Sequence, residues 1–177
     1  MIGERDYDTH IFLVKNVLDD GRRRNLLESA QTMTWHDSAS KAEAAPTRRV
    51  ARMTLEKGSL EQSLEGAFPK QIGGRSFLDL SYERVIVAQY RQGDFFARHT
   101  DAAYVRGPGV KSMFSVLVYL NDDFQGGETS FPDLRRIVKP EAGCALVFGH
   151  GHEHIGLPIS QGVKYALHLF AMYHDAA

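Results

Sequence analysis

Two side chains that can share one metal ion stand two positions apart in the sequence, His99 and Asp101. Alternation along a strand turns residues i and i+2 to the same face, so this imidazole and this carboxylate point the same way. A pair of this kind is common by chance and does not complete a metal site. Further candidate ligands cluster about fifty positions later, at His150, His152 and His154.

Two histidines and one carboxylate, with the other coordination positions open, form the facial triad of non-haem Fe(II) oxygenases. Imidazole nitrogen and carboxylate oxygen suit Fe(II), and the absence of neighbouring cysteines argues against a structural zinc cage. A solvated, histidine-rich turn is the competing interpretation of residues 149–154. The metal hypothesis therefore depends on whether the rest of the chain can bring one of these histidines to His99 and Asp101.

The composition fits one globular domain that can bury a core. The chain has 177 residues, of which 43% are hydrophobic and 24% are charged. A formal net charge of −1 gives no general attraction to nucleic acid or to an anionic membrane. We expect neither as a partner, and we expect the short arginine clusters at 22–24, 48–49 and 135–136 to lie on solvated surface.

Cysteine usage and the first residues bear on location. Cys144 is the only cysteine, which excludes an intrachain disulfide and favours a reducing compartment. Residues 1–6 carry charges and lack the apolar core of a signal peptide, and the apolar stretch 113–120 is too short to span a bilayer. We therefore expect a cytoplasmic protein.

Residues 1–81 are expected to support the site from outside. Their pattern predicts a strand within 10–18, helices over 22–33 and 59–68, a polar loop over 35–47 and a strand over 48–55. The second helix has a capping box that begins at Ser59 and an apolar stripe at Leu60, Leu64, Ala67 and Phe68. Both helices should pack on the outside of a sheet.

From residue 82 to residue 173 the sequence reads as short strands separated by turns. The expected strands cover 84–90, 95–101, 113–120, 128–131, 135–138, 144–148 and 162–173, with an exposed loop over 102–111. Regularly spaced short strands are typical of a barrel or a sandwich. No internal repeat or linker is visible, so we predict one domain over 1–177.

Six stretches within 82–173 resemble one known family in order and spacing. Residues 90–101 resemble the first iron-binding motif of prolyl 4-hydroxylase-like 2-oxoglutarate/Fe(II) dioxygenases, and 115–122 with 126–132 resemble that family's central strand and Gly-Gly-Glu-Thr turn. Residues 138–148 resemble its next strand. Residues 154–159 and 162–165 resemble the segments with its distal histidine and its co-substrate lysine.

The resemblance implies a mainly β (α+β) fold, a double-stranded β-helix or jelly-roll core with the N-terminal helices outside. It implies Fe(II) as cofactor, 2-oxoglutarate and O2 as co-substrates, and ascorbate as a further candidate. The implied metal ligands are His99, Asp101 and His154. Lys164, which stands in an apolar run where an unpaired ammonium is costly, would bind 2-oxoglutarate; the other candidates for this co-substrate are Tyr119, Tyr90 and Ser115.

The distal ligand has a rival alignment. The family often has Glu-Gly after the distal histidine, whereas Ile155-Gly156 follows His154 here, so His152 with Glu153 is an alternative. His154 is preferred because it keeps Gly156 and the ten-residue step to Lys164.

The implied reaction is hydroxylation of an unactivated C–H bond, of a prolyl residue or a related amino acid, with release of succinate and CO2. Because related halogenases lack the carboxylate ligand, Asp101 favours hydroxylation. Further candidate pocket or substrate residues are Arg98, Arg106, His152 and His168, and the loop 102–111 is a candidate lid. The alternatives are a free amino acid or small natural product as substrate, a non-catalytic cupin-like metal-binding or sensing barrel, and a zinc hydrolase. The oligomeric state is left open.

Overall fold

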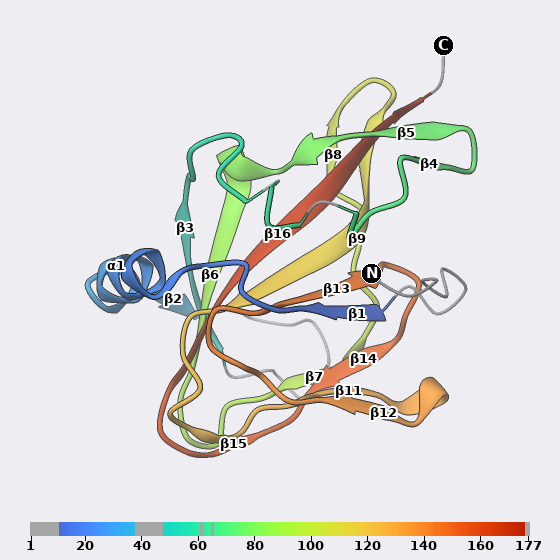
Figure 1. Cartoon of the computed structure of the whole chain (residues 1–177). Coiled ribbons are helices and arrows are strands. Elements are labelled where there is room, and N and C mark those ends of the chain that lie inside the picture. Colours follow the sequence, from blue (N-terminus) through green and yellow to red (C-terminus); the bar gives the residue numbers. More distant parts are fainter. Residues whose placement is uncertain (1–10, 38–47, 61, 65, 176–177) are drawn as a thin grey trace.

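The computed structural model describes residues 11–37, 48–60, 62–64 and 66–175. Within these ranges the chain forms many short antiparallel strands and one α-helix, which confirms the mainly β prediction. The long strands cross the centre of the molecule, and the helix lies at one side (Figure 1). No helix in the described ranges is long and apolar enough to cross a membrane.

The larger sheet carries most of the core. Its order is β1 (Ile11–Val14), β13 (Ala145–Gly149), β9 (Val110–Tyr119), β16 (Lys164–Asp175), β6 (Val85–Tyr90), β3 (Arg49–Met53) and β2 (His36–Asp37). Three more strands attach to it: β5 (Arg75–Leu80) pairs with β16, β4 (Gln71–Ile72) with β5, and β8 (Val105–Gly107) with β9. A 3-10 turn, Tyr82–Arg84, leads into β6.

A second, smaller sheet lies at the lower right of Figure 1. Its order is β12 (Arg136–Val138), β11 (Thr129–Phe131), β14 (His154–Gly156) and β7 (Phe96–His99), with a 3-10 turn, Pro132–Leu134, between β11 and β12. A separate ladder joins β10 (Gln125–Gly126) to β15 (Ile159–Gln161). The inner faces of the two sheets meet over Tyr119, Phe131 and Phe148.

Strand β16 is buried on both faces, which explains its nearly continuous apolar sequence. Its odd-numbered residues, such as Leu167 and Leu169, pack in the cluster that includes Ala30 of α1 (Asp20–Gln31). Asp19 caps this helix, because its side chain accepts a hydrogen bond of 2.9 Å from the amide of Arg22. Lys164, Ala166 and His168 lie on the other face of β16, where Ala166 packs in the cluster that includes Phe131 of the smaller sheet.

The helix predicted over 59–68 is wrong, although its apolar stripe is buried as expected. Leu64 N–H donates to the carbonyl of Leu60 at 3.0 Å, but Ala67 N–H then donates to Leu64 at 2.8 Å, and the described residues form successive turns. Gly66 has a φ of 69°, which lies in the left-handed region and interrupts a right-handed helix. Only one α-helix therefore supports the sheet in the described part of the chain.

Two other expectations need correction. Part of the predicted exposed loop 102–111 is a hairpin, in which β8 and β9 pair around the turn at Gly107-Pro108-Gly109. In the predicted loop 35–47, residues 36 and 37 form β2, and 38–47 lie outside the described residues. The hairpin β4–β5 was not predicted, although Gly73 and Gly74 both have positive φ angles, as its tight turn requires.

Candidate metal centre

Strand pairing brings two of the predicted ligands together. In the antiparallel pair of β7 and β14, His154 lies directly opposite His99, and their ring centroids are 4.2 Å apart. The sequence separates the two residues by more than fifty positions. Because residues opposite one another on adjacent strands share a face, the register of this one strand pair decides that both imidazoles face the larger sheet.

Asp101 joins the two histidines from just beyond the end of β7. Its Oδ1 is 3.4 Å from His99 Nε2, and one ligand atom each of His99, Asp101 and His154 lies within 4.8 Å of the others. On the side of the larger sheet, Ser115 Oγ donates a hydrogen bond to Asp101 Oδ2, and His168 Nε2 lies 3.7 Å from the same oxygen. The carboxylate is thus held between the two sheets.

The surroundings keep Asp101 ionised. Burial works to raise its pKa, but the proximity of His99, His168 and His154 and the hydrogen bond from Ser115 outweigh burial, so the pKa lies well below its usual range. Burial lowers the pKa of His154, and it lowers the pKa of His168 to about 4. Near neutral pH the site therefore offers an ionised Asp101 and an uncharged His154, the protonation states that metal binding needs.

Backbone carbonyls orient both imidazoles. Nδ1 of His99 donates to the Ala97 carbonyl at 2.7 Å, and Nδ1 of His154 donates to the His152 carbonyl at 3.0 Å. With the proton on Nδ1, the lone pair of each ring is on Nε2. In the described part of the chain, His99 Nε2 is buried and has no hydrogen-bond partner. This nitrogen without a partner lies beside a carboxylate and a second imidazole, and such a set of ligand atoms fits Fe(II).

Lys164 lies in the same cavity as the three candidate ligands. Its side chain is 6% exposed, and its Nζ donates to the Gly127 carbonyl at 2.6 Å. The ammonium lies 5.3 Å from the ring centroid of Tyr119 and 5.4 Å from that of Tyr90. Burial lowers the pKa of Lys164 to about 8, against a smaller opposite effect of Glu128. No ion pair to Lys164 occurs among the described residues, so an anionic ligand would supply the missing countercharge.

The turn that faces Lys164 depends on glycine. Gly127 has a φ of 70°, and a Cβ atom there would lie 2.4 Å from Ile159 Cδ1 and 3.3 Å from Lys164 Cδ. Nearby, the Tyr119 hydroxyl is 3.5 Å from Thr129 Oγ1, and burial raises the pKa of Tyr119. The tyrosine therefore stays protonated. Its hydroxyl lies beside Thr129 of the cavity wall, while Tyr119 itself is not among the described residues that line the cavity.

The remaining predicted residues differ in their distance from this centre. Arg98 is on the outer side of β7, where it pairs with Asp133 at 3.0 Å and with Glu153. Arg106 on β8 pairs with Asp79 at 2.7 Å and with Glu83 at 2.9 Å. Neither arginine is among the described residues that line the cavity, and their contact with substrate stays a prediction.

The structure also distinguishes His152 from His154 as the candidate distal ligand. The ring of His152 faces Phe131 at 6.3 Å between centroids, and His152 is outside the three-residue metal group found among the described residues. His154 is 5% exposed and belongs to that group. The geometry therefore favours the alignment that uses His154.

Five of the described residues in the cavity wall were not predicted as site residues: Arg48, Phe96, Leu117, Thr129 and Gly156. The guanidinium carbon of Arg48 lies 3.8 Å from the centroid of the Phe96 ring, and its Nη1 donates to the Tyr90 hydroxyl at 3.1 Å. Of the two arginines at 48–49, both predicted to lie on solvated surface, only Arg49 does so, and it pairs with Asp37 at 3.5 Å. Strand alternation separates the two arginines, but the sequence gives no signal of which one faces inward.

Comparison with known proteins agrees with this geometry. The family model described as the 2OG-Fe(II) oxygenase superfamily matches residues 85–172. A prolyl 4-hydroxylase candidate from Acanthamoeba polyphaga mimivirus is 29% identical over 106 residues, which cover 50% of this chain and 44% of that protein. The chain spans less than half the length of the curated relatives that it matches.

Solved structures share the fold. A viral collagen prolyl hydroxylase from Paramecium Bursaria Chlorella virus-1, in its 2OG complex, superposes with a TM-score of 0.67 at 18% identity, over 93% of this chain and 96% of that chain. A prolyl hydroxylase from Trichoplax adhaerens, in complex with a peptide fragment of the hypoxia inducible factor oxygen degradation domain, gives a TM-score of 0.71 at 18% identity, over 96% of this chain and 85% of that chain. The expected jelly-roll architecture is thus common to this chain and these structures.

Proposed function

Because the chain belongs to the 2OG-Fe(II) oxygenase superfamily, we propose that it is an Fe(II)- and 2-oxoglutarate-dependent dioxygenase that hydroxylates an unactivated C–H bond. The observation that carries the proposal is the juxtaposition of two sites in one cavity. One is the group His99, Asp101 and His154, with ligand atoms within 4.8 Å of one another. The other is Lys164, a buried ammonium in the same cavity.

His99, Asp101 and His154 would hold the iron on one face and leave its other positions open. Bound Fe(II) would supply the activation of O2, coupled to conversion of 2-oxoglutarate into succinate and CO2. The protein contributes binding and orientation. The Ala97 and His152 carbonyls hold both rings with Nε2 toward the cavity, and the hydrogen bond from Ser115 holds the carboxylate in place beside His168.

Lys164 would bind the distal carboxylate of 2-oxoglutarate, and the Tyr119 hydroxyl would donate a second hydrogen bond. Tyr90 and Tyr119 flank the ammonium with their rings and limit the access of water. This placement supports a defined orientation in which the keto acid end of the co-substrate points toward the ligands. Ser115 contacts Asp101 in the structure, so we propose that it acts through that carboxylate.

We propose a prolyl residue of a peptide, or a related amino acid, as the substrate. This finer point is supported by the similarity to the mimivirus prolyl 4-hydroxylase candidate and to the two solved prolyl hydroxylases, one of which is in complex with a peptide fragment. Asp101 supports hydroxylation, because as a ligand it would take the coordination position that a halide would need.

The direct test is anaerobic absorption spectroscopy of the protein with Fe(II) and 2-oxoglutarate. A visible charge-transfer band should form in the wild type, and it should be lost in His99→Ala and in His154→Ala. His152→Ala is the matched control and should keep the band. Loss of the band in His152→Ala with retention in His154→Ala would reverse the assignment of the distal ligand.

Mass spectrometry of candidate substrates then tests the reaction. A gain of one oxygen that is matched by succinate in equal amount is expected for a hydroxylase. A protein that binds Fe(II) and 2-oxoglutarate, yet forms no succinate with any substrate, would instead be a binding or sensing barrel. Bound Zn(II) with hydrolysis that is independent of 2-oxoglutarate would contradict the proposal outright.

A further inference from the structure

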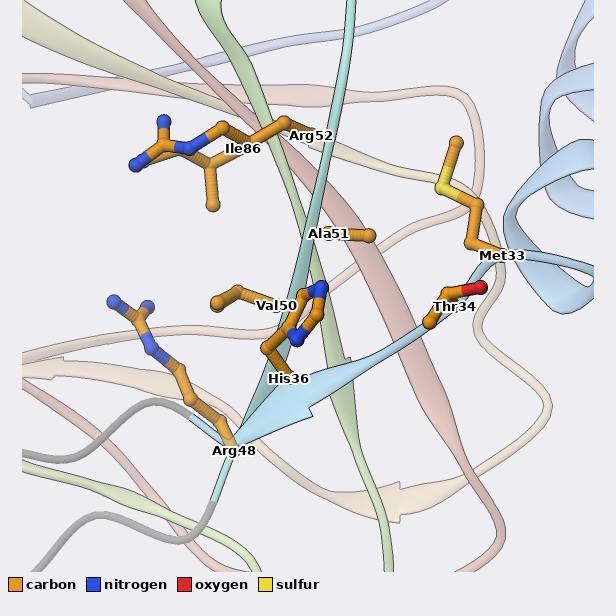
Figure 2. A pocket seen from close by; sticks show the side chains of 8 residues that line it. All are labelled: Met33, Thr34, His36, Arg48, Val50, Ala51, Arg52 and Ile86. Carbon is orange, nitrogen blue, oxygen red and sulfur yellow. The ribbon is translucent and has the colours of Figure 1, made fainter.

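A second cavity lies beside the candidate metal centre, along β3 next to the short edge strand β2. It has a volume of about 670 Å³, which is within the range of ligand sites. The described residues that line it are Met33, Thr34, His36, Arg48, Val50, Ala51, Arg52 and Ile86 (Figure 2). We call this cavity the β3 groove.

Arg48 connects the β3 groove to the metal centre, because it lines both cavities. On the centre's side its guanidinium stacks on Phe96, whose ring centroid is 3.8 Å from that of His99. In the described part of the chain its Nε is buried without a hydrogen-bond partner, while Nη1 donates to Tyr90. The arginine is thus fixed by two aromatic residues and retains an unused donor.

Strand register shows that the groove continues the inner wall of the site. Arg52 on β3 lies opposite Ile86 on β6, and Ile86 lies opposite His168 on β16, whose Nε2 is 3.7 Å from Asp101. Arg52 is therefore two strands away from His168, or about 10 Å along the sheet. Figure 2 shows Arg48, Val50 and Arg52 on one side of β3 and Ala51 on the other.

The charge of the groove is one-sided. Its lining includes two arginines and one histidine but no carboxylate among the described residues. None of the ion pairs within residues 11–37, 48–60, 62–64 and 66–175 involves Arg48 or Arg52. Between the arginines lie apolar side chains, Val50 and Ile86. An anion with an apolar neighbour matches this pattern.

The length of the groove selects among anions. Arg48 and Arg52 are four residues apart on an extended chain, which separates them by about 13 Å. A free amino acid that reacts at the metal centre is too short to span from there to Arg52, whereas a few extended residues of a peptide cover that distance. Arginine is also the residue best suited to bidentate binding of a carboxylate.

We propose that the β3 groove binds an acidic segment of a peptide substrate, and that Arg52 recognises an Asp or Glu side chain a few residues from the hydroxylated position. Arg48 positions the segment where it leaves the metal centre. This inference rests on the proposed function, since it assigns a substrate class to the same site. Arg48 and Arg52 are accordingly specificity-determining residues of that reaction.

The test measures binding rather than turnover. Short proline-containing peptides, identical except for Glu, Gln or Lys at successive positions on either side of the proline, are titrated into the anaerobic protein loaded with Fe(II) and 2-oxoglutarate. Fluorescence anisotropy of the labelled peptide reports the dissociation constant. At one position Glu should bind up to about fivefold tighter than Gln, as for a partly exposed charged contact, and Lys should bind weakest.

Variants of β3 assign the effect. Arg52→Gln should remove the difference between Glu and Gln peptides, and Arg52→Glu should reverse the preference toward Lys. Arg49→Gln is the matched control. It removes the same charge three positions before Arg52, on the opposite face of β3, and it should leave the preference for Glu over Gln peptides unchanged. Arg48→Gln should weaken the binding of all peptides, whichever residue they carry at the tested position.

Several results would overturn the proposal. Equal binding of Glu, Gln and Lys peptides at every position, or no binding of any peptide, would exclude an acidic peptide in the β3 groove. An equal loss of preference in Arg49→Gln would reduce the effect to overall charge. A retained charge-transfer band in the same samples shows that the Fe(II) and 2-oxoglutarate sites are intact, so a failure of this inference is distinguishable from a failure of the proposed function.

Discussion

The substitution Lys164→Met separates two effects of the buried lysine. One is its cost to the free energy of unfolding of the ligand-free protein, and the other is its contribution to the affinity for 2-oxoglutarate. Burial lowers the pKa of Lys164 from 10.5 to about 8. Each pKa unit corresponds to 1.36 kcal/mol, so the charged ammonium lowers the free energy of unfolding by about 3 kcal/mol near neutral pH. The substitution also removes the hydrogen bond to Gly127, which offsets about 1 kcal/mol of the gain in stability. The variant should therefore be about 2 kcal/mol more stable without ligand.

The same substitution should strongly weaken the binding of 2-oxoglutarate. Removal of one partner from a buried ion pair costs about 2–5 kcal/mol, which is about 30- to 5,000-fold in the dissociation constant. Thermal unfolding with and without 2-oxoglutarate measures both effects. The ligand-free variant should unfold about 4–8 °C higher than the wild type, and added 2-oxoglutarate should give it almost no further shift.

The pH dependence gives an independent reading of the same lysine. The folded-state pKa is below the unfolded value, so the unfolded chain binds more protons between pH 8 and pH 10.5. The stability of the ligand-free wild type should gain from Lys164 as the pH rises through this window, and the advantage of Lys164→Met should shrink accordingly. The affinity of the wild type for 2-oxoglutarate should fall above about pH 8, because binding then requires protonation of the lysine.

Lys111→Met is the matched control, since Lys111 is an exposed lysine of the same sheet. It should change neither the ligand-free stability nor the shift caused by 2-oxoglutarate by more than about 0.5 kcal/mol. The reasoning is refuted if Lys164→Met is less stable than the wild type without ligand and still binds 2-oxoglutarate with wild-type affinity.

Three further substitutions test other parts of the structure. Asp101→Ala should weaken Fe(II) more than about 100-fold in anaerobic calorimetry, because loss of a ligand exceeds the effect of outer-shell changes, and an unchanged affinity would exclude Asp101 as a ligand. Arg106→Met should lower the free energy of unfolding by about 1–3 kcal/mol, because it leaves the buried Asp79 without its closest partner. Urea unfolding measures this change. A loss of Fe(II) affinity without a loss of stability would place Arg106 in the site instead. Gly127→Ala should weaken 2-oxoglutarate, because its Cβ would displace Ile159 and press on the lysine, and a wild-type dissociation constant would show that the turn can relax.

Much of the fold could be predicted from local patterns. Alternating apolar residues and turn glycines located β6, β9, β13 and β16 within a few residues, because both signals depend on neighbours in the chain. The apolar stripe from Leu60 to Phe68 correctly indicated a buried segment. It did not indicate its conformation, because a left-handed Gly66 and tertiary packing override the helical period.

The sequence by itself determined the chemical types at the candidate site and two of its local relations. The i, i+2 spacing places His99 beside Asp101, and a lysine within an apolar run requires an anionic partner if it is buried. These conclusions follow from backbone geometry and from the cost of burying charge, which act within a few residues.

Only the tertiary structure decided which distant residues meet. The register of β7 with β14 sets His154 opposite His99, and a register shifted by one residue would turn the same imidazole away from the larger sheet. The face that β3 presents puts Arg48 in the site and Arg49 on the surface, although the two are identical in type and adjacent in sequence. Register and facing are settled by packing of the whole sheet, and no local pattern encodes them.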